Sequence, residues 1–234
     1  MLSDGAAAKQ VLWVFLGEGI VANIRVVLKD NARVIEGRIN KAIASGMNDA
    51  LLKGRSVITR RLVPMIKQWL SEQPEMMALK SGGVGSLPSQ LGLVAGTESR
   101  ITDVIINSIS SSTHVDFKSV TSNLRQGGLI IKCQIEDFSN LLSIPQGFVE
   151  DINIAGQLHW LKWLLEEGNR AIITGYHYEP NSGSGRSRGG SMGSGSIWRV
   201  PPQYSGTSDD NFITRALANK EKHIQKLLEQ VLGG

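Results

Sequence analysis

Three short patterns in the sequence could do chemistry, and each lacks the surroundings that its chemistry requires. Residues 189–193 match the G-x-S-x-G pattern of serine hydrolases, but Ser191 stands in a run of glycine and serine rather than between a strand and a helix. His177 and Glu179 form the H-x-E pair of zinc deaminases, which also need a later P-C-x-x-C motif, and no cysteine follows. The single cysteine, Cys133, cannot supply two thiolates to a zinc ion within one chain. We therefore expect no catalytic residue, no bound metal and no cofactor, and a protein that is not an enzyme.

One concentration of positive charge lies in the first half of the sequence. Five basic residues follow one another with no acidic residue among them: Lys53, Arg55, Arg60, Arg61 and Lys67. Residues 1–96 carry 12 basic and 7 acidic side chains, within a chain of net charge +4. Such a patch could meet phosphates or an acidic protein surface. It could also be the solvated face of a helix, and the sequence leaves these alternatives open.

A second concentration lies in residues 181–195, which are dominated by glycine and serine and include Arg186 and Arg188, with Arg199 shortly after. This composition is similar to arginine–glycine segments that bind RNA or single-stranded DNA, although the first aromatic residue after the arginines is Trp198. Alternatively, the segment is an arm that cannot bury anything in isolation and that a neighbouring subunit holds in place.

The elements around these charges follow from the spacing of apolar residues. Residues 1–96 are predicted to be a helical region. An apolar stripe recurs there every four residues, at Ile35, Ile39, Ile43, Met47 and Leu51. Residues 20–28 extend the stripe upstream, and a second stripe covers residues 58–70, where Pro64 either begins or kinks the helix. Pro74 is expected to end or bend this element.

Residues 97–234 are predicted to be an α+β domain with a long Gly/Ser/Arg loop at 181–195. Alternating patterns predict four strands, at residues 115–119, 129–135, 171–178 and 196–200. Helices are expected from Thr97 or Ser99, over residues 156–167, and from Ser208-Asp209-Asp210 to the C-terminal glycines. Because the helix at 156–167 is apolar over most of its circumference, it must lie in the core or be covered by a neighbour. The expected fold is α+β, with helices packed on a small, roughly four-stranded antiparallel sheet and a helical N-terminal region.

The composition excludes two classes of protein. Among the 234 residues, 41% are hydrophobic and 20% are charged, which is typical of a globular protein and argues against a disordered chain. The apolar run at residues 11–16 is too short to span a bilayer and lacks the flanks of a signal peptide. We expect this run to be a buried start of the fold or an interface segment.

The C-terminal third resembles a known group of proteins in five stretches: 160–168 (WLKWLLEEG), 171–176 (AIITGY), 185–192 (GRSRGGSM), 198–207 (WRVPPQYSGT) and 210–217 (DNFITRAL). Together these stretches resemble virion structural proteins of tailed bacteriophages, especially contractile-tailed ones. The resemblance is to the neck or tail-completion type, related in layout to the minor tail proteins of lambda-like phages. It implies a few helices against a small antiparallel sheet, and rings at the junction of head and tail.

The resemblance also implies partners and a location. It implies a homo-oligomeric ring in the virion, contacts with neighbouring neck and tail proteins, no membrane, and a ring through which DNA could pass. Buried anchors and arginine–carboxylate pairs would then make the contacts. The candidate interface residues are Trp160, Trp163, Arg186, Arg188, Trp198, Arg199 and Arg215. Trp198 could instead belong to its own core, and Arg215 to a solvated helix. Two other functions stay open: another tail or baseplate component, and a nucleic-acid-binding module that uses the Gly/Arg loop.

Overall fold

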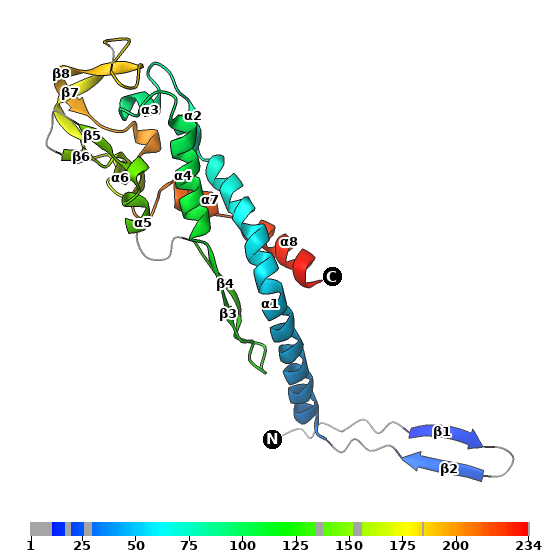
Figure 1. Cartoon of the computed structure of the whole chain (residues 1–234). Coiled ribbons are helices and arrows are strands. Elements are labelled where there is room, and N and C mark those ends of the chain that lie inside the picture. Colours follow the sequence, from blue (N-terminus) through cyan, green and yellow to red (C-terminus); the bar gives the residue numbers. More distant parts are fainter. Residues whose placement is uncertain are drawn as a thin grey trace, which may run out of the picture. The chain divides into compact units, whose positions relative to one another are not determined.

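The computed structural model describes residues 11–16, 20–25, 30–133, 138–151, 156–183 and 185–233. They combine helices with short antiparallel strands, which confirms the predicted α+β class (Figure 1). The chain divides into a first compact unit, Met1–Asp49 with Ser119–Gly127, and a second, Ala50–Lys118 with Gly128–Gly234. The division therefore falls near residue 49 rather than at residue 96. The reason is that residues 50–96 share one hydrophobic core with the C-terminal half.

Helix α1 spans Ala32–Ser71 and contains 40 residues. It confirms the helical predictions for both apolar stripes, which belong to this single element. Pro64 lies inside the helix, where it removes one backbone hydrogen bond without ending the element. Helix α2, Pro74–Lys80, follows with its proline in the first turn, so Pro74 separates two helices as predicted.

The first elements of the first unit among the described residues are strands rather than a helix. Strands β1, Val11–Leu16, and β2, Ile20–Arg25, pair as an antiparallel hairpin. The helical prediction for residues 20–28 is therefore wrong for β2, whose β-branched Ile20, Val21 and Ile24 suit a strand. The prediction that residues 11–16 are buried or lie at an interface concerns side chains outside the described residues.

The described part of the second unit alternates short helices with antiparallel hairpins (Figure 1). The hairpins are β3 (His114–Lys118) with β4 (Gly128–Lys132), β5 (Val149–Asp151) with β6 (Gly156–Leu158), and β7 (Ile173–Pro180) with β8 (Gly190–Trp198). The α-helices are α3 (Leu87–Gln90), α4 (Glu98–Ser111), α5 (Ser139–Leu142), α6 (Trp160–Leu165), α7 (Phe212–Leu217) and α8 (Glu221–Leu232). Two short 3₁₀ helices are η1 (Pro145–Gly147) and η2 (Pro202–Tyr204).

The strands pair two by two over the described residues and do not join into one sheet of about four strands. Each of the three hairpins in the second unit places apolar residues in a buried cluster with helices rather than against a further strand. Val115 of β3 and Trp198 of β8 belong to the same buried cluster as Ile58 of α1, Ile105 of α4 and Leu161 of α6. Two-stranded hairpins need such packing, because alone they are marginal in water.

Three predicted boundaries change. Strand β8 begins at Gly190, so the loop between β7 and β8 is shorter than residues 181–195. Residues 156–158 form strand β6, and the helix predicted at 156–167 is reduced to α6. The last predicted helix is two helices, because Asn219 adopts a left-handed conformation (φ 58°) between α7 and α8. Asn211, rather than the preceding serine and aspartates, caps α7.

Candidate interaction surfaces

The stretches that carry the phage resemblance are distant in sequence and lie together in the second unit. The Gly206 N–H donates to the Trp163 carbonyl at 3.0 Å, and the Gly168 N–H donates to the Gly206 carbonyl at 2.8 Å. The Ile172 N–H donates to the Trp198 carbonyl at 2.9 Å. A Cβ atom at Gly206 would overlap the backbone of α6, so the close approach of these segments requires glycine there.

The tryptophans predicted to be interface anchors are mostly core residues. Trp160 is 0% exposed and Trp198 is 4% exposed, so neither reaches a neighbour across the surface of this chain. The prediction that Trp160 and Trp198 are interface residues is therefore wrong. The alternative prediction, that Trp198 belongs to the core of its own chain, agrees with its burial. Trp163 is half-buried, with its indole Nε1 buried. Helix α6 is accordingly covered mainly by its own chain, since Trp160, Leu161, Leu164 and Leu165 are buried.

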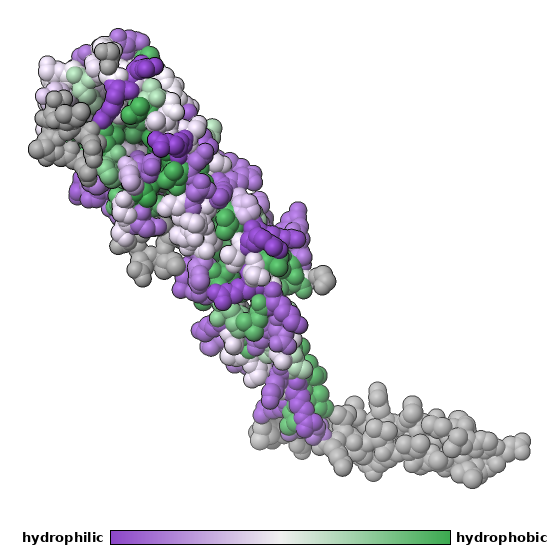
Figure 2. Space-filling view, in the orientation of Figure 1, coloured by the Kyte–Doolittle hydropathy of each residue, from purple (hydrophilic) through white to green (hydrophobic). Residues whose placement is uncertain are grey.

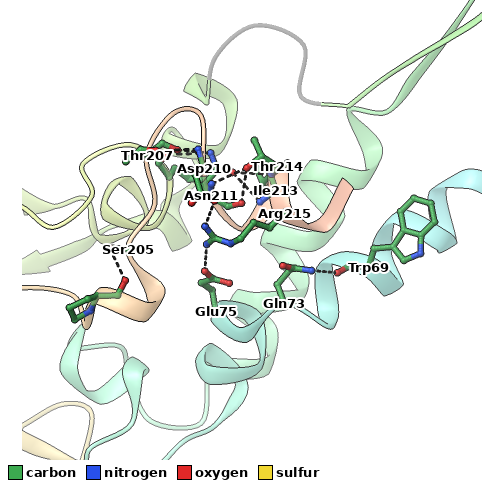
Figure 3. A network of polar contacts seen from close by, with 12 residues as sticks. Trp69, Gln73, Glu75, Ser205, Thr207, Asp210, Asn211, Ile213, Thr214 and Arg215 are labelled. Atoms are coloured by element: carbon green, nitrogen blue, oxygen red, sulfur yellow. Dashed lines mark hydrogen bonds and ion pairs between the residues drawn. The ribbon is translucent and has the colours of Figure 1, made fainter. Parts of the chain in front are cut away.

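Arg215 forms ion pairs within the second unit rather than being fully solvated (Figure 3). Its Nη2 donates to Glu75 Oε1, and its Nη1 lies 2.5 Å from Asp210 Oδ1. The Glu75 side chain is only 1% exposed, so this pair crosses from α7 to α2 in the interior. Burial opposes the charge of Arg215, but the hydrogen bond to Asp210 and the negative charge of Glu75 raise its pKa above the ordinary value. The guanidinium is therefore a permanent cation in a structural network.

The cap of α7 belongs to the same network (Figure 3). The side-chain oxygen of Asn211 accepts from the backbone N–H groups of Ile213 and Thr214, and Thr214 Oγ1 accepts from the Asn211 N–H. The amide nitrogen of Asn211, which is 0% exposed, donates to the Thr207 carbonyl at 2.9 Å. This capping box fixes the start of α7 and so positions Arg215.

The Gly/Arg loop is packed against its own chain. Tyr178 Oη accepts from the Gly85 N–H at 3.2 Å and donates to the Gly189 carbonyl at 2.7 Å. A Cβ atom at Gly189 would overlap the side chain of Ser89, which is itself buried. The expectation that only a neighbouring subunit would hold residues 181–195 is therefore wrong for the described loop residues. The reason is that glycine lets the two backbones approach closely.

Three of the predicted interface arginines keep their side chains at the surface. Arg186, Arg188 and Arg199 are all exposed, the first two on the packed loop and the third directly after β8. An open pocket of about 460 Å³ lies beside the loop, and its lining includes Leu158, Met192 and Arg186. Arg186 is the only charged residue among the described residues that line this pocket.

Part of the first predicted apolar stripe is exposed on α1. Ile39, Ile43 and Met47 lie four residues apart and are 52%, 44% and 45% exposed. Figure 2 shows hydrophobic surface along this part of α1. The helical spacing was recognisable in the sequence, but an amphipathic stripe normally faces a core. We name these three residues the α1 stripe.

The residues tested for chemistry do not gather into a site. His177 Nε2 lies 3.1 Å from Glu179 Oε1 on the same strand. Over the described residues, no three His, Cys, Asp or Glu side chains come together as metal ligands would. Burial raises the pKa of the Cys133 thiol, which keeps it protonated. Among the helices described, none combines the length and apolar content needed to cross a bilayer. No protein-family model, curated protein or solved structure matches this chain.

Proposed function

We propose that this protein is a structural subunit that works by assembling with copies of itself and with other proteins. We further propose that the assembly is a neck or tail-completion ring in the virion of a tailed bacteriophage, and that the chain is not an enzyme. The α1 stripe is the observation that supports assembly. The resemblance of residues 160–217 supports the particular kind of particle.

The α1 stripe is too small to hold two subunits together by itself, so an assembly needs further contacts. Fully burying one such side chain contributes about 1.5–3 kcal/mol, so burying the exposed half of each contributes about 1 kcal/mol. Three residues together supply about 3 kcal/mol, which is below the ~4–15 kcal/mol cost of joining two molecules. A stable complex therefore needs further contacts. The exposed Arg188 and Arg199 can supply charge-assisted hydrogen bonds to acidic neighbours.

Ring closure follows from the kind of contact involved. When one surface of a subunit contacts a different surface of the next, repetition of the contact gives a ring if the rotation closes. The α1 stripe is an apolar surface of the first unit, and the exposed arginines are a polar surface of the second unit. The two surfaces differ in chemistry and do not complement each other, so in a ring each would contact another surface of the neighbouring subunit.

The test compares two exposed apolar residues on α1. Ile43 is 44% exposed and Val34 is 41% exposed, but nine residues of an α-helix place them about 180° apart around the axis. Size-exclusion chromatography with light scattering gives the mass of each protein over a range of concentrations, and electron microscopy gives its form. We expect multimers, with closed rings, for the unchanged chain and for Val34→Gln. We expect smaller species for Ile43→Gln.

Each outcome bears on one part of the proposal. A binding free energy of ~8 kcal/mol between subunits corresponds to a dissociation constant of about 1 µM. A chain that stays monomeric at about 100 µM would therefore refute self-assembly. Equal masses for Ile43→Gln and Val34→Gln would refute the role of the α1 stripe. Open filaments, or stacked forms without closed rings, would favour another tail or baseplate component.

A further inference from the structure

The second part of α1 carries a straight row of cations. Lys53, Arg60 and Lys67 are seven residues apart, and seven residues return an α-helix to within about 20° of the same side. Each step also advances about 10.5 Å along the axis, so the row is about 21 Å long. All three residues lie in the second unit, between Ala50 and Ser71. We name them the cation row.

Arg55 lies in the same part of α1 but does not belong to the cation row. Arg55 turns inward, where its Nε donates to the Val115 carbonyl at 2.7 Å. Lys53 and Arg60 are exposed, Lys67 is half-buried, and none of the three makes an ion pair with a described residue. No acidic residue occurs between Asp49 and Glu72 that could neutralise them along the helix.

Helix α8 packs against α1 on sides other than that of the cation row. Helix α8 approaches α1 at Gly54, beside Leu232, and at Trp69, whose ring lies 6.0 Å from that of His223. Gly54 is one residue beyond Lys53 and Trp69 is two beyond Lys67, which places both on other sides of α1. The acidic residues of α8 therefore lie away from the row, and Glu229 accepts a hydrogen bond from Gln225 of its own helix.

We propose that the cation row binds the phosphate backbone of duplex DNA. An acidic protein surface is the weaker candidate, because protein interfaces depend on apolar or aromatic anchors and are poor in lysine. No large apolar side chain is exposed between Lys53 and Ser71 in the described chain. Single-stranded nucleic acid needs aromatic platforms, and the aromatic residue of this stretch, Trp69, is 6% exposed. A polyanion needs only the cations, since its affinity comes from released counterions.

The spacing also fits a duplex. Double-stranded DNA carries one charge per about 1.7 Å of its axis, so a row of about 21 Å faces some twelve phosphates. Because neighbouring cations are about 10.5 Å apart, each meets a different phosphate. This inference goes beyond the proposed function, since a single subunit can bind DNA whether or not rings form.

The test measures how steeply DNA affinity depends on salt. A dye-labelled duplex is titrated with the full chain by fluorescence anisotropy between about 50 and 200 mM NaCl, a range in which phosphate contacts dominate. The row variant is Lys53→Gln/Arg60→Gln/Lys67→Gln. The control variant, Arg100→Gln/Lys222→Gln/Lys226→Gln, removes the same charge from exposed positions on α4 and α8. Chromatographic mass is recorded for all three proteins, so that a change in assembly is seen separately.

The row variant should lose three phosphate contacts and the control none. We expect its slope of log K against log salt to be less steep by about 2.7, and its affinity near 100 mM salt to fall more than about tenfold. The control should keep the unchanged chain's slope within about 0.9. Equal slopes for the two variants, or no binding of the duplex by the unchanged chain, would overturn the proposal. Competition with polyglutamate is a further test. If polyglutamate of equal charge displaces the duplex at equal concentration, the proposal is also overturned, because any acidic chain would then suffice.

Discussion

Replacing Arg215 with methionine should destabilise the second unit through a charge left behind in its interior. The Glu75 side chain is 1% exposed, and one of its oxygens accepts from Arg215 (Figure 3). Its other oxygen, Oε2, is buried with no hydrogen-bond donor among the described residues. Arg215→Met therefore leaves a buried carboxylate with no cation beside it, which is the costly way to break an ion pair.

The size of the effect follows from the burial of the two partners. Breaking a buried pair by removing one partner costs about 3–5 kcal/mol. Because the Arg215 side chain is 34% exposed, water can reach part of the vacated space. We therefore expect a loss near the lower limit, about 3 kcal/mol of the free energy of unfolding. That is a large share of the roughly 5–15 kcal/mol that stabilises a typical domain.

A double variant separates the charge from the packing. Glu75→Met/Arg215→Met removes both charges and keeps unbranched side chains that can fill the space. Asp210 loses its partner as well, but its side chain is 72% exposed and stays hydrated. Replacing both members of a buried pair by apolar residues is often close to neutral. We expect the double variant to be at least about 2 kcal/mol more stable than Arg215→Met alone.

Urea unfolding followed by tryptophan fluorescence measures these differences, since Trp69, Trp160, Trp163 and Trp198 all report on the second unit. Equal denaturant slopes for the three proteins are required before their midpoints are compared. A double variant as unstable as Arg215→Met would refute the reasoning. The loss would then come from the missing contacts of the arginine stem, and the buried charge of Glu75 would be irrelevant.

Two further predictions concern the loop and the β3–β4 hairpin. Gly189→Ala should overlap Ser89, lower the free energy of unfolding by about 1–3 kcal/mol and raise hydrogen exchange in the loop. The control Gly46→Ala meets no neighbouring atom and should be neutral or stabilising. Equal effects of the two variants would contradict the packing of the loop. The hydrogen bond from Lys132 lowers the pKa of Asp116, so Lys132→Met should raise that pKa in a carbon NMR titration. Because the pKa is lowered in the folded chain, the stabilisation exists above about pH 4 and is lost as the pH falls further, so the two proteins should converge in stability under acid.

Local spacing was enough to predict the main elements of the fold. Apolar residues at helical intervals gave α1, and alternation between Val115 and Cys133 gave the β3–β4 hairpin. Helix α4 begins directly after Thr97, one of the two predicted starts, although the Thr97 side chain makes no capping hydrogen bond. These signals work because each depends on residues within one or two turns or strands of each other. The break between α7 and α8 gave no such signal, because asparagine adopts a left-handed conformation without a proline or glycine to announce it.

The candidate interface could not be read from sequence in the same way. Whether a tryptophan is an anchor or a core residue depends on what covers it, and Trp198 is covered by segments distant in the chain. Arg215 shows the same limit, because its partner Glu75 lies 140 residues away. The composition of the Gly/Arg loop suggested mobility, but Gly189 packs closely against Gly83 and Ser89, and the Arg186 carbonyl accepts from the Ala95 N–H.

The exposure of the α1 stripe favours a protein that assembles over a protein that works as a monomer. Beyond Leu51, which is 8% exposed, Ile58, Leu62, Ile66 and Leu70 of α1 are buried in the second unit's core, whereas Leu52 is exposed. Within the first unit, the hairpin tip meets α1 at Asn48, whose side chain exchanges two hydrogen bonds with Val120. Asn48 follows Met47 by one residue, about 100° around the helix, so this contact covers a different side. A chain that worked alone would gain solubility from polar residues at Ile39 and Ile43, so the exposure of two large apolar side chains there favours the proposal of a partner that buries them.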